Sequence, residues 1–233
     1  MSQPDLDHLH VRGRWPLPAR PRVAIVGSRR PSPYGEAVAE QLGSDLAKSD
    51  VIVVSGLALG IDAAAHRGAL NGGGLTVAVM GTGVDVVYPA AHFRLAEEIL
   101  RAGGALVSQF PDGTNPRRQN FPARNWTMAA LSDVVVVVEA GESSGALITA
   151  DAAVHLHKEV MAVPGSIFSA LSVGAHSLLR DGAGLVQNAR DVVAVLGLGG
   201  EVLDDPLSTP KSLGFALMPE RDGLLPICPM CLL

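Results

Sequence analysis

The chain has 233 residues, of which 48% are hydrophobic, 18% charged and 4% aromatic, and its formal net charge is −5. This composition excludes a disordered chain, which needs low hydrophobicity and high net charge, and it argues against an aromatic-rich β-sandwich. No apolar run approaches the ~18 residues of a membrane span, and the first ten residues lack the basic start and apolar stretch of a signal peptide. We therefore expect a cytoplasmic protein.

Strand-like apolar runs alternate with helix-like segments from residue 22 to residue 196. In chain order, the apolar spacing predicts strands at 23–26, 51–54, 75–80, 105–107, 134–138, 159–163 and 185–187, and helices at 35–48, 61–70, 94–101, 125–131, 146–157, 174–180 and 190–196. Val134–Val138 is apolar on both faces, which is typical of a central strand covered by helices on both sides. The predicted fold class is α/β, with a doubly wound, mostly parallel sheet and helices on both faces.

Two stretches flank this pattern. Residues 1–21 contain several prolines and are expected to be a loosely docked lead-in, and residues 197–233 are expected to be an irregular tail. The tail holds Cys228 and Cys231 in a C-x-x-C spacing. A zinc site needs four ligands and no second pair exists, so we expect an incidental tail, with an adventitious disulfide or an intermolecular metal site as the alternative. We expect no metal and no cofactor.

The first expected strand leads into Gly27, Ser28, Arg29 and Arg30. In doubly wound folds, ligands bind beyond the carboxyl ends of the strands, where this turn lies. Its backbone N–H groups, hydroxyl and two arginines suit a phosphate, although a plain turn with surface arginines fits the residues as well. The G-x-G-x-x-G fingerprint is absent, so a standard NAD site is not expected.

The second expected strand is followed by Gly56 and Gly60, and the next helix begins with Asp62 and His66 on one face. The glycines allow close approach of a ligand to the backbone. Asp62 and His66 are interpreted as a structural pair rather than a catalytic one, because no partner nucleophile is evident.

The third expected strand is followed by Gly81 and Gly83, but no helix begins at once. Asp85 and Tyr88 come later in the same loop. These two side chains either hold the loop or face a ligand, and the residues alone leave both interpretations open.

The most basic segment precedes the central strand, with no acidic residue between Asp112 and Asp133. It interleaves arginines with amide and aromatic side chains: Arg117, Arg118, Asn120, Phe121, Arg124, Asn125 and Trp126. Such a mixture binds single-stranded nucleic acid, because arginine contacts phosphate while aromatic rings stack on bases. The alternative is a solvated loop in which Phe121 and Trp126 anchor the core.

The central strand ends at Glu139, and Ser144 and Gly145 begin the next helix, with Thr149 one turn further on. Hydroxyls and N–H groups at a helix N-terminus suit phosphate, while a serine N-cap is the simpler interpretation. The five loops converge on one edge of the sheet. Together they predict a phosphate-bearing ligand, without distinguishing a nucleotide from a polynucleotide.

Six ordered blocks between residues 11 and 195 resemble the DNA processing protein A family, also called Smf. The blocks are V-A-I-V-G-S-R, S-G-L-A-L-G-I-D-A-A-A-H-R-G-A-L, V-M-G-T-G-V-D-V-V-Y-P, N-F-P-A-R-N, S-G-A-L-I-T-A and V-P-G-S-I-F-S. The resemblance implies an extended Rossmann-like domain over residues 22–196. It also implies a non-enzymatic homodimer that binds and protects single-stranded DNA and loads RecA onto it, in natural transformation or recombinational repair.

Carried over by position, the resemblance makes Arg29 the principal phosphate contact. Asp62 and His66 would hold the second helix in place. The DNA-binding residues expected on this basis are Gly27, Ser28, Arg29, Arg30, Gly56, Gly60, Gly81, Gly83, Arg117, Arg118, Asn120, Arg124, Asn125, Trp126, Ser144, Gly145 and Thr149.

The chain departs from the family at three positions that are usually basic, where it has Ala58, Trp126 and Ser143. Each missing basic contact weakens DNA binding and lowers its salt dependence, although Trp126 can compensate by stacking on a base. No complete winged-helix domain is expected after residue 196.

Two alternatives remain open. A Rossmann-like phosphoribohydrolase would need a P-G-G-x-G-T-x-x-E motif, where this chain has E-A-G-E-S-S-G-A-L-I-T-A with Glu139 and Glu142 before the turn. A degenerate family member would act mainly as a protein partner, which the missing basic residues and the negative net charge favour.

Overall fold

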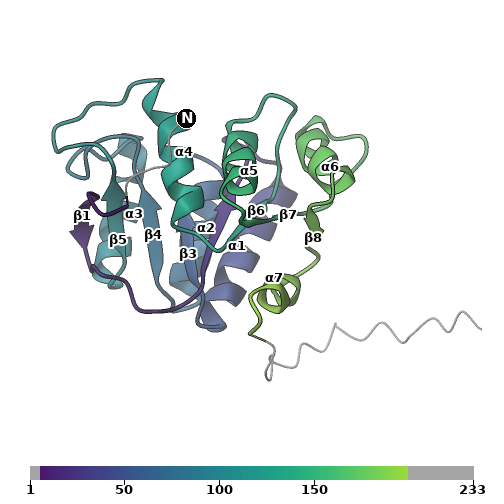
Figure 1. Ribbon diagram of the computed structural model, residues 1–233, viewed down its shortest axis with the longest axis horizontal. Coiled ribbons are helices and arrows are strands. Elements are labelled where there is room, and N and C mark those ends of the chain that lie inside the picture. Colours follow the sequence, from purple (N-terminus) through teal and green to yellow (C-terminus); the bar gives the residue numbers. More distant parts are fainter. Residues whose placement is uncertain (1–5, 199–233) are drawn as a thin grey trace, which may run out of the picture. The chain divides into compact units, whose positions relative to one another are not determined.

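One eight-stranded sheet, ordered β1-β5-β4-β3-β2-β6-β7-β8, organises the computed structural model, which describes residues 6–198 (Figure 1). The strands are β1 (His10–Gly13), β2 (Arg22–Val26), β3 (Ile52–Ser55), β4 (Thr76–Val79), β5 (Ala105–Ser108), β6 (Val134–Val137), β7 (Glu159–Ala162) and β8 (Gly184–Leu185). The α-helices are α1 (Pro33–Lys48), α2 (Ile61–Asn71), α3 (Phe93–Arg101), α4 (Asn120–Ala130), α5 (Gly145–His155), α6 (Val173–Arg180) and α7 (Ala189–Val195), and two short 3-10 turns cover Ala90–His92 and Ala170–Ser172.

The strands from β2 to β8 are all parallel to one another, and β1 at the edge is antiparallel to its neighbour β5. The order of the strands reverses between β2 and β6, which lie side by side. Such a reversal leaves a crevice beyond the carboxyl ends of the two strands. The predicted doubly wound, mostly parallel sheet is confirmed, and β2 and β6 are the strands that position the site.

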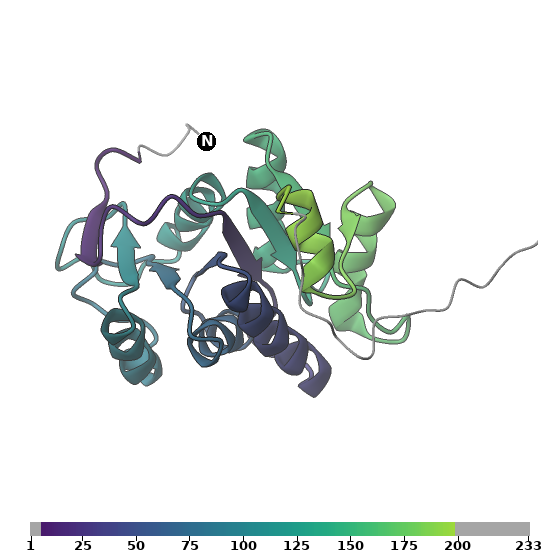
Figure 2. The same ribbon diagram turned by 90° about the horizontal axis from the view of Figure 1, so that it is seen from below.

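The valines of β6, together with Val138 directly after it, pack on both faces of the sheet. Val134, Val136 and Val138 pack into the core under α1, α2 and α7, while Val135 and Val137 pack into the core under α4 and α5. Figure 2 shows the helices on the two opposite faces, with α1 and α2 on one side and α4 and α5 on the other. The prediction that this strand lies between two helical layers is therefore confirmed.

The sequence missed β1, which pairs with β5 so that Val11 lies opposite Val107. Only one residue of β1 is aliphatic and most of the strand is exposed, so it carries no apolar signal. The lead-in is thus tied to the sheet at residues 10–13 instead of being loosely docked throughout. The expectations for the tail, Cys228 and Cys231 included, lie outside the described residues except at Gly197 and Leu198.

Helix α4 begins at Asn120, five residues earlier than the sequence predicted. Pro122 suggested a loop, but a proline is tolerated in the first turn of a helix, where the N–H groups have no partner within the helix. Phe121 is consequently helical.

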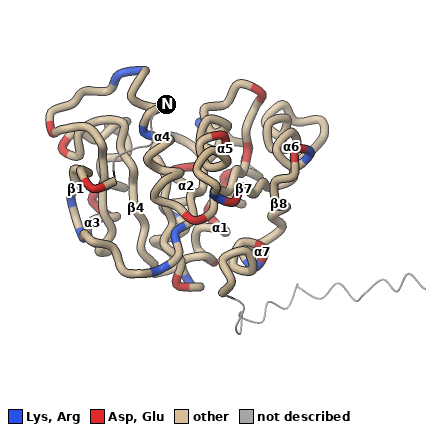
Figure 3. The backbone as a smooth tube through the Cα atoms, in the orientation of Figure 1, with Lys and Arg blue, Asp and Glu red and all other residues tan. Residues whose placement is uncertain are grey.

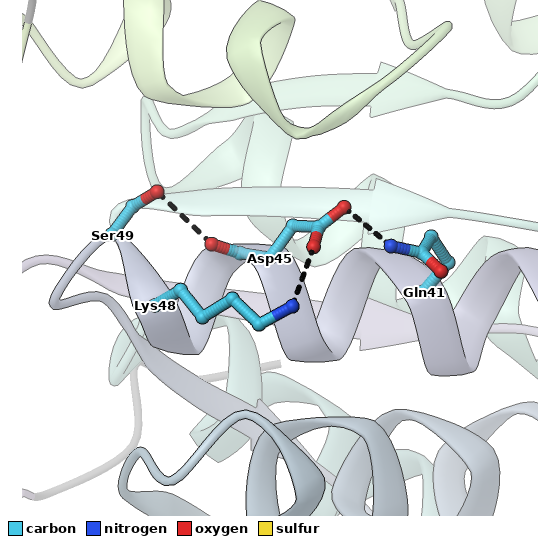
Figure 4. A network of polar contacts seen from close by, with 4 residues as sticks. All are labelled: Gln41, Asp45, Lys48 and Ser49. Carbon is cyan, nitrogen blue, oxygen red and sulfur yellow. Dashed lines mark hydrogen bonds and ion pairs between the residues drawn. The ribbon is translucent and has the colours of Figure 1, made fainter. Parts of the chain in front are cut away.

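The end of α1 carries a polar network around Asp45 (Figure 4). The carboxylate of Asp45 accepts a hydrogen bond from Gln41 at 2.8 Å and pairs with Lys48 at 3.4 Å, and Ser49 Oγ donates to the Asp45 carbonyl oxygen at 3.0 Å. Exposed pairs of this kind stabilise a helix by only about 0.2–0.5 kcal/mol each. The position of α1 therefore depends mainly on its packing against α2.

That packing requires glycine at position 68. A Cβ on Gly68 would lie 2.0 Å from the carbonyl oxygen of Glu40, so the two helices approach too closely for a side chain there. We expect Gly68→Ala to lower the free energy of unfolding by about 2 kcal/mol in urea denaturation, despite the better helix propensity of alanine. Gly145→Ala is the control, because a Cβ there meets nothing within 4 Å. A Gly68→Ala protein as stable as the wild type would contradict this helix packing.

None of the helices within residues 6–198 combines the length and the apolar character that crossing a membrane requires.

Candidate nucleic-acid interface

A cavity of about 690 Å³ opens at the carboxyl ends of β2 and β6, where the strand order reverses. Its walls come from the turn after β2, the loop after β3, the first turns of α4 and the start of α5. It brings together ten of the residues singled out in the sequence: Gly27, Ser28, Arg29, Asp62, Arg118, Arg124, Asn125, Ser144, Gly145 and Thr149. Figure 3 shows a basic segment in the loop that enters α4, at the same edge of the sheet.

Arg29 stands over an aromatic ring in this cavity. Its guanidinium carbon lies 5.4 Å from the centre of the Phe121 ring, which lies 5.7 Å from the centre of the Tyr88 ring. A cation over a ring face gains about 0.5–1 kcal/mol at an exposed site, which favours this position for the arginine. The side chain of Arg29 is exposed and forms no ion pair with the described residues. Its charge is therefore available to an anion beside an aromatic surface.

The turn that carries Arg29 is held by Glu139, at the end of β6. The N–H of Ser28 donates to the Glu139 carbonyl oxygen at 2.7 Å. The carboxylate of Glu139 accepts from the N–H of Ser32 at 2.8 Å and from its hydroxyl at 2.6 Å. Glu139 is 3% exposed and does not line the cavity, so its carboxylate secures the turn and the start of α1.

The start of α5 forms the facing wall. Ser144 caps the helix and accepts from the N–H of Ala146 at 3.3 Å. Thr149 is fully buried, lines the cavity, and its hydroxyl has no hydrogen-bond partner among the described residues. A helix N-terminus attracts anions through its dipole and free N–H groups. The serine N-cap, the simpler of the two interpretations, is therefore present, and a phosphate at this wall stays a prediction.

Arg124 lies in the floor of the cavity and is only 4% exposed. Its Nη1 donates to the carbonyl oxygens of Gly56 and Val79 at 2.5 and 2.6 Å, and its Nε donates to Asn125 Oδ1 at 3.0 Å. Burial lowers the pKa of Arg124, and nearby Asp62 opposes that shift. Burial raises the pKa of Asp62, while Arg124 and the N–H groups of Ala58 and Gly56 act in the opposite direction.

His66 does not bond to Asp62, the residue with which the sequence paired it. Its Nδ1 lies 2.7 Å from Thr76 Oγ1, and this hydroxyl donates to the Val53 carbonyl oxygen at 2.8 Å. Because the hydroxyl has one proton, it accepts from His66, which fixes the proton of His66 on Nδ1. His66 is fully buried, outside the cavity, and holds α2 against β4.

Several other residues of the predicted site lie outside the cavity lining: Arg30, Gly56, Gly60, Gly81, Gly83, Arg117, Asn120 and Trp126. Trp126 packs against the core under α4 and α5, with its ring 5.7 Å from that of His155. A Cβ on Gly81 would lie 2.8 Å from the Phe121 ring, so this glycine makes room for the side chain. Of the three usually basic positions, Ala58 and Ser143 line the cavity, and Trp126 does not.

Phe121 and Tyr88 line the cavity although neither was placed in the predicted site. No spacing in the sequence distinguishes an aromatic side chain that anchors the core from one that contacts a ligand. Their proximity to Arg29 appears only once β2, β4 and α4 are brought to one edge. No group of His, Cys, Asp or Glu within residues 6–198 is arranged to hold a metal ion.

The family model described as DNA recombination-mediator protein A matches residues 3–197. The chain belongs to this family. A Mycobacterium tuberculosis protein with the description "Putative DNA processing protein DprA" is 48% identical over 198 residues, which cover 82% of this chain and 51% of that protein. The chain thus spans about half the length of this relative.

Two solved structures of proteins named DNA processing protein A share the fold. DNA processing protein A from Streptococcus pneumoniae is 44% identical with a TM-score of 0.75, over 80% of this chain and 65% of that one. DNA processing protein A from Helicobacter pylori is 31% identical with a TM-score of 0.74, over 83% of this chain and 88% of that one. The description of the Helicobacter structure concerns its single-stranded DNA binding mode.

Proposed function

We propose that the chain binds single-stranded DNA in the cavity between β2 and β6, as a binding protein without catalysis. The observation that carries this proposal is the position of Arg29 over Phe121, facing the start of α5 across one cavity. Phosphates contact Arg29, Arg118 and the N-terminus of α5, and bases stack on Phe121 and Tyr88. A duplex keeps its base faces stacked inside the helix, so aromatic contacts of this kind favour a single strand.

The family supports a wider role for this binding. We propose that the chain protects incoming DNA and loads RecA onto it, as a cytoplasmic homodimer, in natural transformation or recombinational repair. The description of the family as a recombination mediator supports this role. The adjacent side chains of Ile167 and Phe168, in the loop after β7, are 82% and 93% exposed and suit a protein partner. Sedimentation of the chain alone and with RecA tests both partners.

The contacts of Glu139 weigh against a phosphoribohydrolase-like reaction. Its carboxylate is bound to Ser32 and lies outside the cavity lining, so it does not face a ribose there. We therefore expect no nucleotide turnover, and turnover that Glu139→Ala abolishes would favour the enzyme instead.

The decisive experiment is fluorescence anisotropy of a labelled single-stranded oligonucleotide and of its duplex, across a salt series. We expect preference for the single strand and an affinity that falls steeply with salt, because phosphate contacts release counterions. Absence of binding at low salt would favour the degenerate protein partner, and equal affinity for the duplex would contradict the stacking contacts.

Restoring a basic residue at Ser143 provides a gain-of-affinity prediction. Ser143 is exposed and lines the cavity, so a lysine there reaches the bound strand. We expect Ser143→Lys to raise the affinity about threefold or more at low salt and to steepen the slope of log K against log salt by about 0.7. Ser177→Lys, on the exposed side of α6, adds the same charge away from the cavity and should leave both unchanged.

A further inference from the structure

Arg124 joins the ends of two strands below the cavity. Gly56 directly follows β3 and Val79 ends β4, and one nitrogen of Arg124, Nη1, donates to the carbonyl oxygens of both residues. Hydrogen bonds from a charged donor are short and strong, and burial strengthens them further. The guanidinium therefore fixes the spacing between the ends of β3 and β4.

Asp62 holds the same turn from the other side. Its Oδ2 accepts from the N–H of Gly56 at 3.0 Å and from that of Ala58 at 3.4 Å. A Cβ on Gly56 would lie 2.2 Å from Arg124 Nη1 and 2.6 Å from Asp62 Oδ2, so both charged groups pack against this glycine. The loop that carries Ala58 into the cavity wall is thus held between a buried cation and a buried anion.

Asn125 continues the connection to the opposite wall. Its Oδ1 accepts from Arg124 Nε, and its Nδ2 donates to the carbonyl oxygen of Gly145 at 3.0 Å. Gly145 is the first residue of α5, beside its cap Ser144. An unbroken series of hydrogen bonds therefore runs from the ends of β3 and β4, through α4, to the start of α5.

We propose that Arg124 is a positioning residue for single-strand binding, which sets the spacing of the loops around the cavity through Gly56, Val79 and Asn125 and is not itself a phosphate contact. This inference rests on the proposed function. It differs from the expectation drawn from the sequence, in which Arg124 added charge for the DNA. Its Nε and Nη1 donate to acceptors within the protein, and these bonds fix the orientation of the guanidinium.

Arg118 provides a matched control, because it lines the same cavity and is exposed. Arg118→Gln and Arg124→Gln each remove one positive charge. For Arg118→Gln we expect the slope of log K against log salt to flatten by about 0.7, as for one lost contact to a single strand. For Arg124→Gln we expect an affinity about tenfold lower at every salt concentration, with the slope unchanged. Arg124→Lys should fall between the wild type and Arg124→Gln, because lysine keeps the charge but lacks the planar fork.

Hydrogen exchange separates a local shift of the loops from unfolding. In Arg124→Gln, the amides of Gly56 and Ala58 should exchange faster while those of β6 stay protected. If Arg124→Gln does not fold, Asn125→Ala replaces it, with an expected threefold loss of affinity and an unchanged slope.

A slope flattened by about 0.7 in Arg124→Gln would make Arg124 a phosphate contact and overturn the positioning role. The positioning role would also be overturned if folded Arg124→Gln bound the single strand with wild-type affinity. The same holds for Asn125→Ala if that variant has to replace Arg124→Gln. Absence of single-strand binding by the wild type would overturn the proposed function together with this inference.

Discussion

Arg29→Ala is expected to lower the affinity for a single-stranded oligonucleotide at least about tenfold, because a hydrogen bond to a charged group contributes about 1.5–3 kcal/mol. The side chain is exposed over the Phe121 ring and lines the cavity. Its loss removes one phosphate contact, so the slope of log K against log salt should flatten by about 0.7. Anisotropy titrations of both proteins over a salt series measure the two effects together.

Arg30→Ala is the matched control for this prediction. Arg30 is the next residue, is equally charged and exposed, and is absent from the cavity lining. We expect its loss to change the affinity by less than about threefold, as for a rim charge. Equal losses in both variants would mean that the arginines act through overall charge and would remove the reason to place the strand in this cavity.

The layers of the fold could be predicted because the strands from β2 to β7 are apolar enough to carry their own signal. Val134–Val138 has no polar residue, so only a central position between two helical layers can bury it. β1 could not be predicted, since its backbone bonds to β5 hold it in place while its side chains remain largely exposed. Pairing with a distant strand leaves no periodic pattern in the sequence.

The edge that holds the site could also be predicted, because parallel strands bring their carboxyl ends to the same edge of a sheet. The sequence could not predict which of Phe121 and Trp126 faces the cavity. These residues are five positions apart on α4 and so point about 140° away from each other. Only one of them can face the cavity, and the expected helix start at Asn125 left Phe121 outside the helix, where this relation was not visible.

The roles of single residues were the least predictable. Gly56 and Gly81 were expected to admit a ligand, but the space they leave is filled by Arg124 and Phe121. A glycine beside a strand end has the same appearance in the sequence whether the ligand or another side chain occupies the space. The same limit applies to Arg124, whose partners are backbone carbonyl groups at the ends of strands 45 and 68 residues earlier in the chain.

The second large effect concerns the response of the fold to acid. His66 is fully buried with its proton on Nδ1, and its Nε2 has no partner among the described residues. Burial lowers the pKa of His66 from 6.5 to about 3, with smaller contributions from His92, Arg124 and Arg67. The unfolded chain therefore binds this proton at a higher pH than the folded chain does. The stabilisation that comes from keeping His66 neutral is complete above the pKa of this histidine in the unfolded chain, and it is lost as the pH falls from 6.5 towards 3.

We expect this histidine alone to lower the free energy of unfolding by about 3 kcal/mol between pH 7 and pH 4. The decrease is about 1.4 kcal/mol for each pH unit below the pKa of the histidine in the unfolded chain. Urea denaturation at several pH values measures it, as the difference between the wild type and His66→Gln. The variant is less stable at neutral pH, because its bond to Thr76 is altered, but its stability should fall less on acidification. Exposed His10 is the control, since the same substitution there should leave the acid response unchanged. If wild type and His66→Gln lose stability in parallel, the unfolding of this domain by acid begins elsewhere, with the carboxylates.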